Sequence, residues 1–291
     1  MSATVLALLL MQAGPLVTGG AAPPIQPVPL PRVGAAAPAA PPAPVAEPTK
    51  LELCLQAADE SPLAAIEGAE EWLKLAKGSA TVDPHLCRGT ALSALERWDE
   101  AEAAYLAGRD AVPVSDPARR AQLGAAAAIA AGEAGAPDRE LTLLDEAHAD
   151  ALRGGDAALA GHIALDRASP LNKRGRIADA AAALAEARAA LPGFYQAWLI
   201  SARFSRQQKQ LTEAQQQIER AADLMPVDPE IGLEAGIIAV LSGRDEAARK
   251  SWQSVIAAAP DSAIAKVAEG YIAQLGPAPS PASTAPALDG R

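Results

Sequence analysis

A period of 34 residues runs through the C-terminal half of the chain. Pro192, Pro226 and Pro260 stand 34 residues apart. A small residue and, four positions later, a large apolar residue recur at the same interval, as Ala180, Ala214 and Ala248, then Leu184, Ile218 and Trp252. A fixed period of this length, with the three kinds of position in register, indicates stacked helical repeats. Such a chain builds its core by packing each unit against its neighbours.

The pattern resembles the tetratricopeptide repeat (TPR), a helix–turn–helix unit. The resemblance implies an all-α, right-handed superhelical solenoid of about thirteen helices over residues 49–275, and a role in holding other proteins. The best matching segments are 82–113, 161–192, 195–226 and 229–260, followed by a capping helix at 261–275, whereas 49–81 match weakly. The composition agrees, because alanine, the best helix former, is abundant and aromatic residues make up only 3% of the chain.

Three irregularities modify this plan. From Pro113 to Pro192 is 79 residues, eleven more than two periods, and we place this insertion in longer helices between 117 and 173. Pro170 is expected to kink or end its helix, because proline lacks the backbone N–H and clashes with the previous turn. Gly89 and Gly236 fall on the small-residue position of the repeat, where the two helices of a unit are expected to cross closely.

The N-terminal segment is predicted to direct export. Residues 4–17 form an apolar run of signal-peptide length, too short to span a bilayer, and 1–22 are assigned as a signal peptide. No Lys or Arg precedes Arg32, so the usual basic segment is missing, and retention of an uncleaved chain in the cytoplasm is the alternative. Residues 23–48, with ten prolines, and 276–291 are expected to be a disordered linker and tail.

The two cysteines are Cys54 and Cys87. In a TPR stack, residues one repeat apart lie on successive first helices, so the resemblance brings these two side chains together. An exported protein would then form a disulfide that fastens the weak first repeat to the second. Two buried free thiols are the alternative. No metal site is expected, because there is no CxxC spacing and His85 would be at most a third ligand.

The partner-binding groove is carried over from the resemblance, in which the first helix of each repeat lines the concave face. Its second, fifth, ninth, twelfth and thirteenth positions supply the expected groove residues. They are His162, Leu165, Ser169, Asn172 and Lys173, then Gln196, Leu199, Arg203, Arg206 and Gln207, then Glu230, Leu233, Ile237, Val240 and Leu241. Leu165 and Ser169 replace the Lys and Asn of chaperone-binding TPRs. The basic and amide side chains predict a carboxylate or an acidic peptide as ligand.

Charge and motif content narrow the function further. The net charge of −10 argues against nucleic acid as a partner, although residues 160–210 hold eight basic and three acidic side chains. No catalytic arrangement, phosphate loop or cofactor motif is present, so we expect no enzyme activity and no cofactor. We expect a protein-interaction scaffold, periplasmic or secreted, in a bacterial cell envelope. A regulatory subunit of an envelope enzyme and a cytoplasmic scaffold are alternatives, and self-association through Ile237, Val240 and Leu241 stays open.

Overall fold

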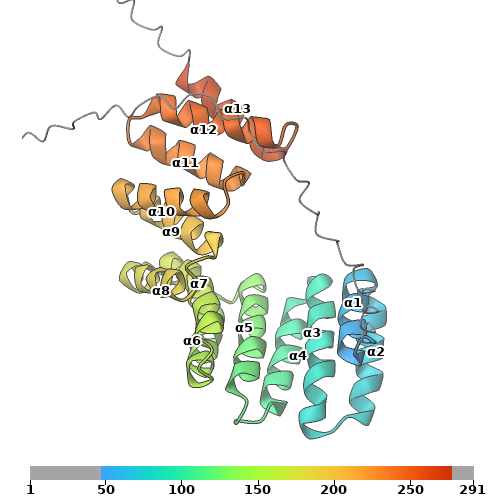
Figure 1. The fold of residues 1–291 in the computed structure, drawn as a ribbon. Coiled ribbons are helices and arrows are strands. Elements are labelled where there is room, and N and C mark those ends of the chain that lie inside the picture. The colour runs from blue at the N-terminus through green and yellow to red at the C-terminus, as the bar shows by residue number, and fades with distance from the viewer. Residues whose placement is uncertain (1–46, 277–291) are drawn as a thin grey trace, which may run out of the picture. The chain divides into compact units, whose positions relative to one another are not determined.

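The structure, a computed structural model, describes residues 47–276. Within them the chain forms thirteen α-helices and one short 3-10 helix, with no β-strand (Figure 1). The prediction of an all-α fold of about thirteen helices is therefore confirmed. The predicted signal peptide, the linker up to residue 46 and the tail from 277 lie outside the described residues.

The helices follow one another at short intervals. In the N-terminal half they are α1 (Lys50–Glu60), α2 (Pro62–Leu75), α3 (Val82–Ala94), α4 (Trp98–Ala111), α5 (Pro117–Glu133) and α6 (Pro137–Arg153), with the 3-10 helix η1 (Gly78–Thr81) before α3. In the C-terminal half they are α7 (Ala157–Lys173), α8 (Ile177–Ala190), α9 (Tyr195–Gln207), α10 (Leu211–Leu224), α11 (Pro229–Leu241), α12 (Asp245–Ala258) and α13 (Ala263–Leu275).

Each helix packs against the next one in the chain, and odd-numbered helices also contact across repeats, as α1 does with α3 and α9 with α11. We call α1, α3, α5, α7, α9, α11 and α13 the first helices. Their starts follow local rules: Asp228 accepts hydrogen bonds from the backbone N–H groups of Glu230 and Ile231 at 2.9 and 3.0 Å, and Pro229 occupies the first helical turn.

Close crossing of the two helices of a repeat depends on glycine at two positions. A Cβ added at Gly89 in α3 would lie 2.6 Å from the ring of Tyr105 in α4. A Cβ at Gly236 in α11 would overlap the indole of Trp252 in α12, whose Nε1 donates to the carbonyl of Leu233 at 3.1 Å. These glycines act through the absence of a side chain, as the sequence predicted.

The extra residues of the middle repeats lengthen three consecutive helices. Helices α5, α6 and α7 each contain 17 residues, whereas α8 to α13 contain 13 or 14. Of the two effects expected of Pro170, a kink or an end of its helix, the end is wrong, because α7 continues to Lys173 with the Pro170 ring fully buried. The cost is local, since the missing N–H of Pro170 leaves the Asp166 carbonyl without its helical donor.

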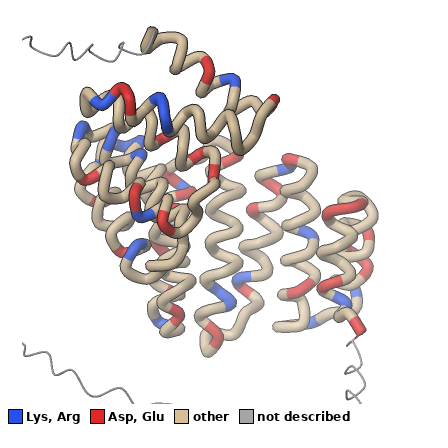
Figure 2. Tube along the Cα trace, turned by 45° about the horizontal axis from the view of Figure 1, so that its top comes forward, with Lys and Arg blue, Asp and Glu red and all other residues tan. Residues whose placement is uncertain are grey.

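A buried carboxylate ties three helices of the N-terminal half together. Asp150 of α6 is 0% exposed and accepts a hydrogen bond at 3.0 Å from Arg109 of α4. Arg120 of α5 approaches to 3.9 Å, and Arg153 also donates to this carboxylate. Lys, Arg, Asp and Glu are otherwise interspersed along the helices (Figure 2). The buried charge is therefore compensated by several cations, as a carboxylate removed from water requires.

Candidate partner-binding groove

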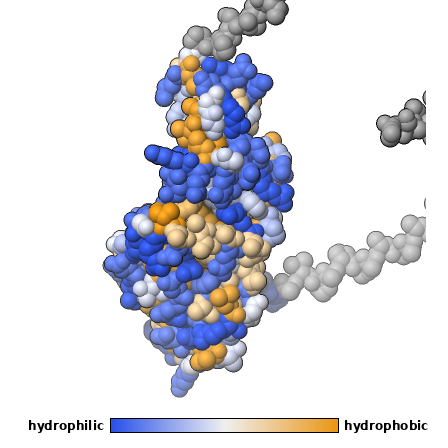
Figure 3. Space-filling view, turned by 90° about the vertical axis from the view of Figure 1, so that its left-hand side faces the viewer, coloured by the Kyte–Doolittle hydropathy of each residue, from blue (hydrophilic) through white to orange (hydrophobic). Residues whose placement is uncertain are grey.

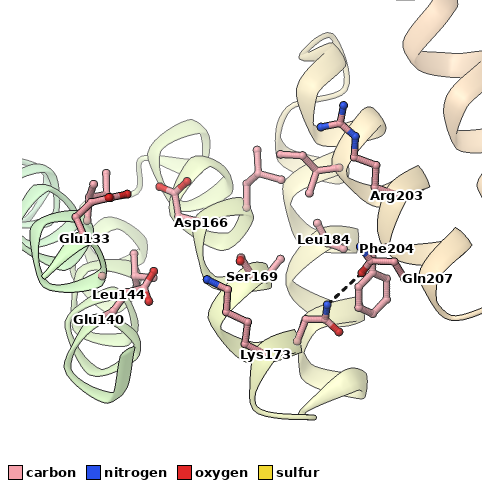
Figure 4. Close-up of a pocket in the computed structure, with 16 residues that line it drawn as sticks. Glu133, Glu140, Leu144, Asp166, Ser169, Lys173, Leu184, Arg203, Phe204 and Gln207 are labelled. Atoms are coloured by element: carbon pink, nitrogen blue, oxygen red, sulfur yellow. Dashed lines mark hydrogen bonds between the residues drawn. The ribbon is translucent and has the colours of Figure 1, made fainter. Parts of the chain in front are cut away.

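A hollow of about 540 Å³ opens between α5, α7 and α9 (Figure 4). We call it the central hollow. Most of its lining comes from three first helices, with smaller contributions from α6 and α8. The side chains used below are Ile129, Glu133, Glu140, Leu165, Asp166, Asn172, Lys173, Ile200, Arg203, Phe204 and Gln207. It thus lies on the helices that the repeat resemblance assigned to ligand binding.

The central hollow has an apolar component that reaches solvent. Ile129 of α5 is 52% exposed and Ile200 of α9 is 37% exposed, while Leu165 and Phe204 are each 8% exposed beneath them. The face drawn in Figure 3 is mostly hydrophilic, with small, separate hydrophobic patches. Two exposed isoleucines at opposite sides of one hollow therefore offer apolar surface that a partner side chain can cover.

Three carboxylates enter the central hollow from its α5–α6–α7 side. They are Glu133 of α5, Glu140 of α6 and Asp166 of α7, and Figure 4 shows Glu140 and Asp166 on facing helices. Within residues 47–276 none of the three forms an ion pair. The negative charge on this side of the hollow is therefore offset only in part, by Lys173 and Arg174, which act on Glu140.

Poor solvation raises the pKa of two of these carboxyls. Loss of solvation raises the pKa of Asp166 to about 6; nearby His162 opposes this shift and Glu140 adds to it. The pKa of Glu140 is also raised, mainly by loss of solvation, although Lys173 and Arg174 act in the opposite direction. Asp166 is exposed and Glu140 half-buried, so both shifts reflect a partial loss of solvation that nearby cations do not fully offset.

Basic and amide side chains of α7 and α9 also line the central hollow. The Asn172 Nδ2 donates to the Gln207 Oε1 at 3.3 Å, and Lys173 lies on the same helix as Asn172. Arg203 also lines the hollow, but its guanidinium donates to Glu230 of α11 at 2.9 Å. Lys173 thus supplies the basic group of the hollow that is without an ion pair among the described residues.

The fifteen residues expected in the groove from sequence separate into two groups. Six of them line the central hollow, namely Leu165, Ser169, Asn172, Lys173, Arg203 and Gln207. The other nine do not line it, namely His162, Gln196, Leu199, Arg206, Glu230, Leu233, Ile237, Val240 and Leu241.

The expectation that Leu199 lines the groove is wrong. This residue is 3% exposed and packs in the core of the α9–α11 region, so it cannot contact a partner. Arg206 is held by Glu234, a carboxylate that is 4% exposed. Leu233 and Ile237 are half-buried against the core formed by α11 to α13.

The basic stretch between 160 and 210 is largely neutralised by ion pairs. Five of its eight basic side chains pair with carboxylates, and four of these carboxylates lie outside the stretch: Arg167 with Asp145, Arg174 with Asp138, Arg176 with Asp179, Arg203 with Glu230 and Arg206 with Glu234. The expectation of a basic groove is therefore wrong for the central hollow, where carboxylates outnumber unpaired basic groups.

Sequence reasoning missed Glu133, Glu140, Asp166, Ile129 and Ile200. The repeat positions were transferred only to α7, α9 and α11, and none of these five residues falls on them. The 17-residue length of α5, α6 and α7 brings an additional helical turn to this region. The sequence feature that points to this region is the eleven-residue insertion, because extra turns in three neighbouring helices enlarge the surface between them.

The structure brings the two cysteines together. Cys54 of α1 and Cys87 of α3 have Cα atoms 5.9 Å apart and sulfur atoms in bonding contact. This separation lies in the range of protein disulfides. Cys87 is fully buried, whereas Cys54 is half-buried, in the cluster that joins the first two repeats.

Two further observations concern the described residues only. No three His, Cys, Asp or Glu side chains among them gather closely enough to hold a metal ion. None of their helices combines the length and the apolar character that crossing a bilayer requires.

Comparison with known proteins agrees with this fold. No family model matches the chain, and no curated protein matches it. Among solved structures the chain is similar to PilW, described as a widely conserved type IV pilus biogenesis factor, with a TM-score of 0.61, 21% identity, and coverage of 76% of this chain and 99% of that one.

Two other solved structures show comparable similarity. One is pilF of Pseudomonas aeruginosa, with a TM-score of 0.60, 13% identity, and coverage of 76% of this chain and 95% of that one. The other is BtubC from P. vanneervenii, with a TM-score of 0.59, 15% identity, and coverage of 84% and 100%. At these identities the likeness defines the fold alone: the chain is a TPR-like helical repeat solenoid.

Proposed function

We propose that this protein is an interaction scaffold whose central hollow holds a segment of a partner protein. The observation that carries the proposal is the central hollow itself, where two exposed isoleucines and several polar side chains meet on the first helices. Partner segments bind TPR-like surfaces by covering apolar side chains and pairing polar ones. The fold offers a rigid surface for this, because α5, α7 and α9 are fixed by packing on both sides.

A location in the bacterial cell envelope is part of the proposal. The apolar run at 4–17 and the approach of Cys54 to Cys87 both favour export, since disulfides persist in oxidising compartments. PilW and pilF, the latter from a bacterium, have a similar fold, and PilW is described as a pilus biogenesis factor. A role in assembling an envelope structure is therefore proposed for this chain as well.

Site-specific crosslinking in the native host tests the proposal. A photoreactive amino acid at Ile200, inside the central hollow, should capture a partner on irradiation. The same amino acid at Gln216, exposed on α10 and away from the hollow, is the matched control. A partner captured at both positions, or at neither, would contradict binding in the hollow.

The identity of the captured protein separates the remaining alternatives. A single envelope enzyme in fixed proportion would favour a regulatory subunit over a general scaffold. Cytoplasmic partners, together with an uncleaved N-terminus and free thiols in the intact mass, would favour a cytoplasmic scaffold. Capture of a second copy of this chain would indicate self-association.

A further inference from the structure

The charge within the central hollow defines the kind of segment that it fits. We propose that the hollow holds a partner segment carrying a Lys or Arg side chain beside apolar residues, with the basic group between Glu133, Glu140 and Asp166. This inference rests on the proposed function, and it replaces the acidic ligand expected from sequence with a basic one.

The position of Glu133, Glu140 and Asp166 sets them apart, because all three line one hollow and none has an ion-pair partner within residues 47–276. On the same group of helices Asp138 and Asp145 each pair with an arginine at 2.6 Å. A cation from outside would thus meet three carboxylates without an ion pair in one hollow.

A cation from the partner would stabilise the charged forms of these carboxylates. The pKa of Asp166 is raised to about 6 and that of Glu140 is also raised, although Asp166 is exposed and Glu140 half-buried, and neither carboxylate has an ion-pair partner among the described residues. A Lys or Arg that enters relieves this deficit and gains charge-assisted hydrogen bonds, which are stronger than those between neutral groups.

The apolar part of the hollow favours a side chain over a simple ion as the occupant. Ile129 and Ile200 lie at opposite sides of the hollow, and they suit the aliphatic stem of a basic side chain and its apolar neighbours. The carboxylates do not form a metal-binding cluster among the described residues. An acidic segment would meet Lys173 but would also lie beside three carboxylates, and a second copy of a chain with net charge −10 would be repelled overall.

Selection of peptides on the full-length protein tests the inference directly. A phage-displayed library of random dodecapeptides is selected on the wild-type chain, and enriched peptides are then measured by fluorescence anisotropy. We expect sequences in which Lys or Arg neighbours Leu, Ile or Val. The variant E133Q/E140Q/D166N should bind these peptides roughly tenfold more weakly or worse, the loss expected for removal of charged hydrogen-bond acceptors.

A control variant with the same change in net charge is E67Q/E246Q/E269Q. These three carboxylates are exposed, form no ion pair among the described residues and lie on α2, α12 and α13, away from the hollow. This control should bind the peptides as the wild type does. Equal weakening in both triple variants would show general attraction to an acidic protein and would overturn the inference. Thermal melting of both variants checks that each is folded.

Other outcomes separate the inference from the proposed function. Enrichment of acidic or neutral peptides whose binding depends on Ile200, tested with I200S, would overturn the basic-segment inference and support binding in the hollow. Enrichment that depends on no residue of the hollow, or no enrichment at all, would count against both. I200S is compared with L152S, because Leu152 is an exposed apolar residue outside the hollow.

Discussion

Gly236 of α11 lies directly against the indole ring of Trp252 of α12, with no room for a Cβ atom between them. The ring is held there by its hydrogen bond from Nε1 to the Leu233 carbonyl and by packing on Tyr271, with ring centroids 5.1 Å apart. We therefore expect G236A to lower the free energy of unfolding by about 1–3 kcal/mol, the usual cost of overpacking a core. Chemical denaturation monitored by circular dichroism measures this change.

Gly270 provides the matched control for that substitution. It lies inside α13, and a Cβ at this position would meet no atom within 4 Å. G270A should therefore stabilise the protein by about 0.5–1 kcal/mol, because alanine loses less backbone entropy in a helix. Equal effects of the two substitutions would show that helix propensity rather than the contact with Trp252 controls position 236.

Asp150 is predicted to be the most sensitive charged position of the N-terminal half. D150A would remove a fully buried carboxylate and leave Arg109, Arg120 and Arg153 close together without their shared partner. We expect destabilisation of about 3 kcal/mol, as for other broken buried ion pairs. D179A, which removes an exposed pair with Arg176, should change stability by less than about 1 kcal/mol. Similar losses in both variants would contradict the structural role of Asp150.

The contact between Cys54 and Cys87 predicts that a disulfide fastens the first repeat. A link across 33 residues contributes about 3–4 kcal/mol in the chain-entropy model. Reduction should therefore increase hydrogen exchange in α1 and α2 first, while α9 to α12 remain protected. Intact mass of protein from its native host, alkylated before and after reduction, provides the direct assay. Two free thiols in that sample would exclude the bond and would remove one argument for export.

The raised pKa of Asp166 predicts a pH-dependent effect of D166N. The pKa of this carboxyl is 3.8 in the unfolded reference and about 6 in the fold, so the folded protein binds its proton more tightly. The contribution of Asp166 to the free energy of unfolding is therefore fully present at a pH below the unfolded pKa. It is lost as pH rises through the folded pKa of about 6. At neutral pH we expect D166N to raise the free energy of unfolding, by about 1 kcal/mol after allowing for solvent screening.

Unfolding of D166N and wild type at a series of pH values measures that difference. The gain should be largest above pH 6 and should disappear below the unfolded pKa of 3.8. The other charged groups at the same hollow are His162, Glu140, Glu133, Lys173 and Arg203. They affect the pH curves of wild type and D166N equally only if the substitution leaves them in place. A gain that is independent of pH would contradict the assignment to Asp166.

The sequence alone determined the fold class, because its 34-residue period is a local property of each unit. Prolines at 192, 226 and 260, and small residues such as Gly236, fix helix ends and close crossings without reference to distant parts of the chain. The groove was only partly predictable. Asn172, Lys173, Arg203 and Gln207 do line the central hollow, since repeat positions map onto one face of a first helix, and their role in binding stays a prediction.

The tertiary structure decided the charge of the central hollow. Arg174 and Arg203 find their partners on α6 and α11, and Leu199 is covered by α9–α11 packing, none of which follows from position within a repeat. Glu140 of α6 and Asp166 of α7 line the same hollow on facing helices, each of which contains 17 residues. Electrostatic balance depends on which side chains of different helices face one another, and a linear sequence with a local repeat does not specify those distances.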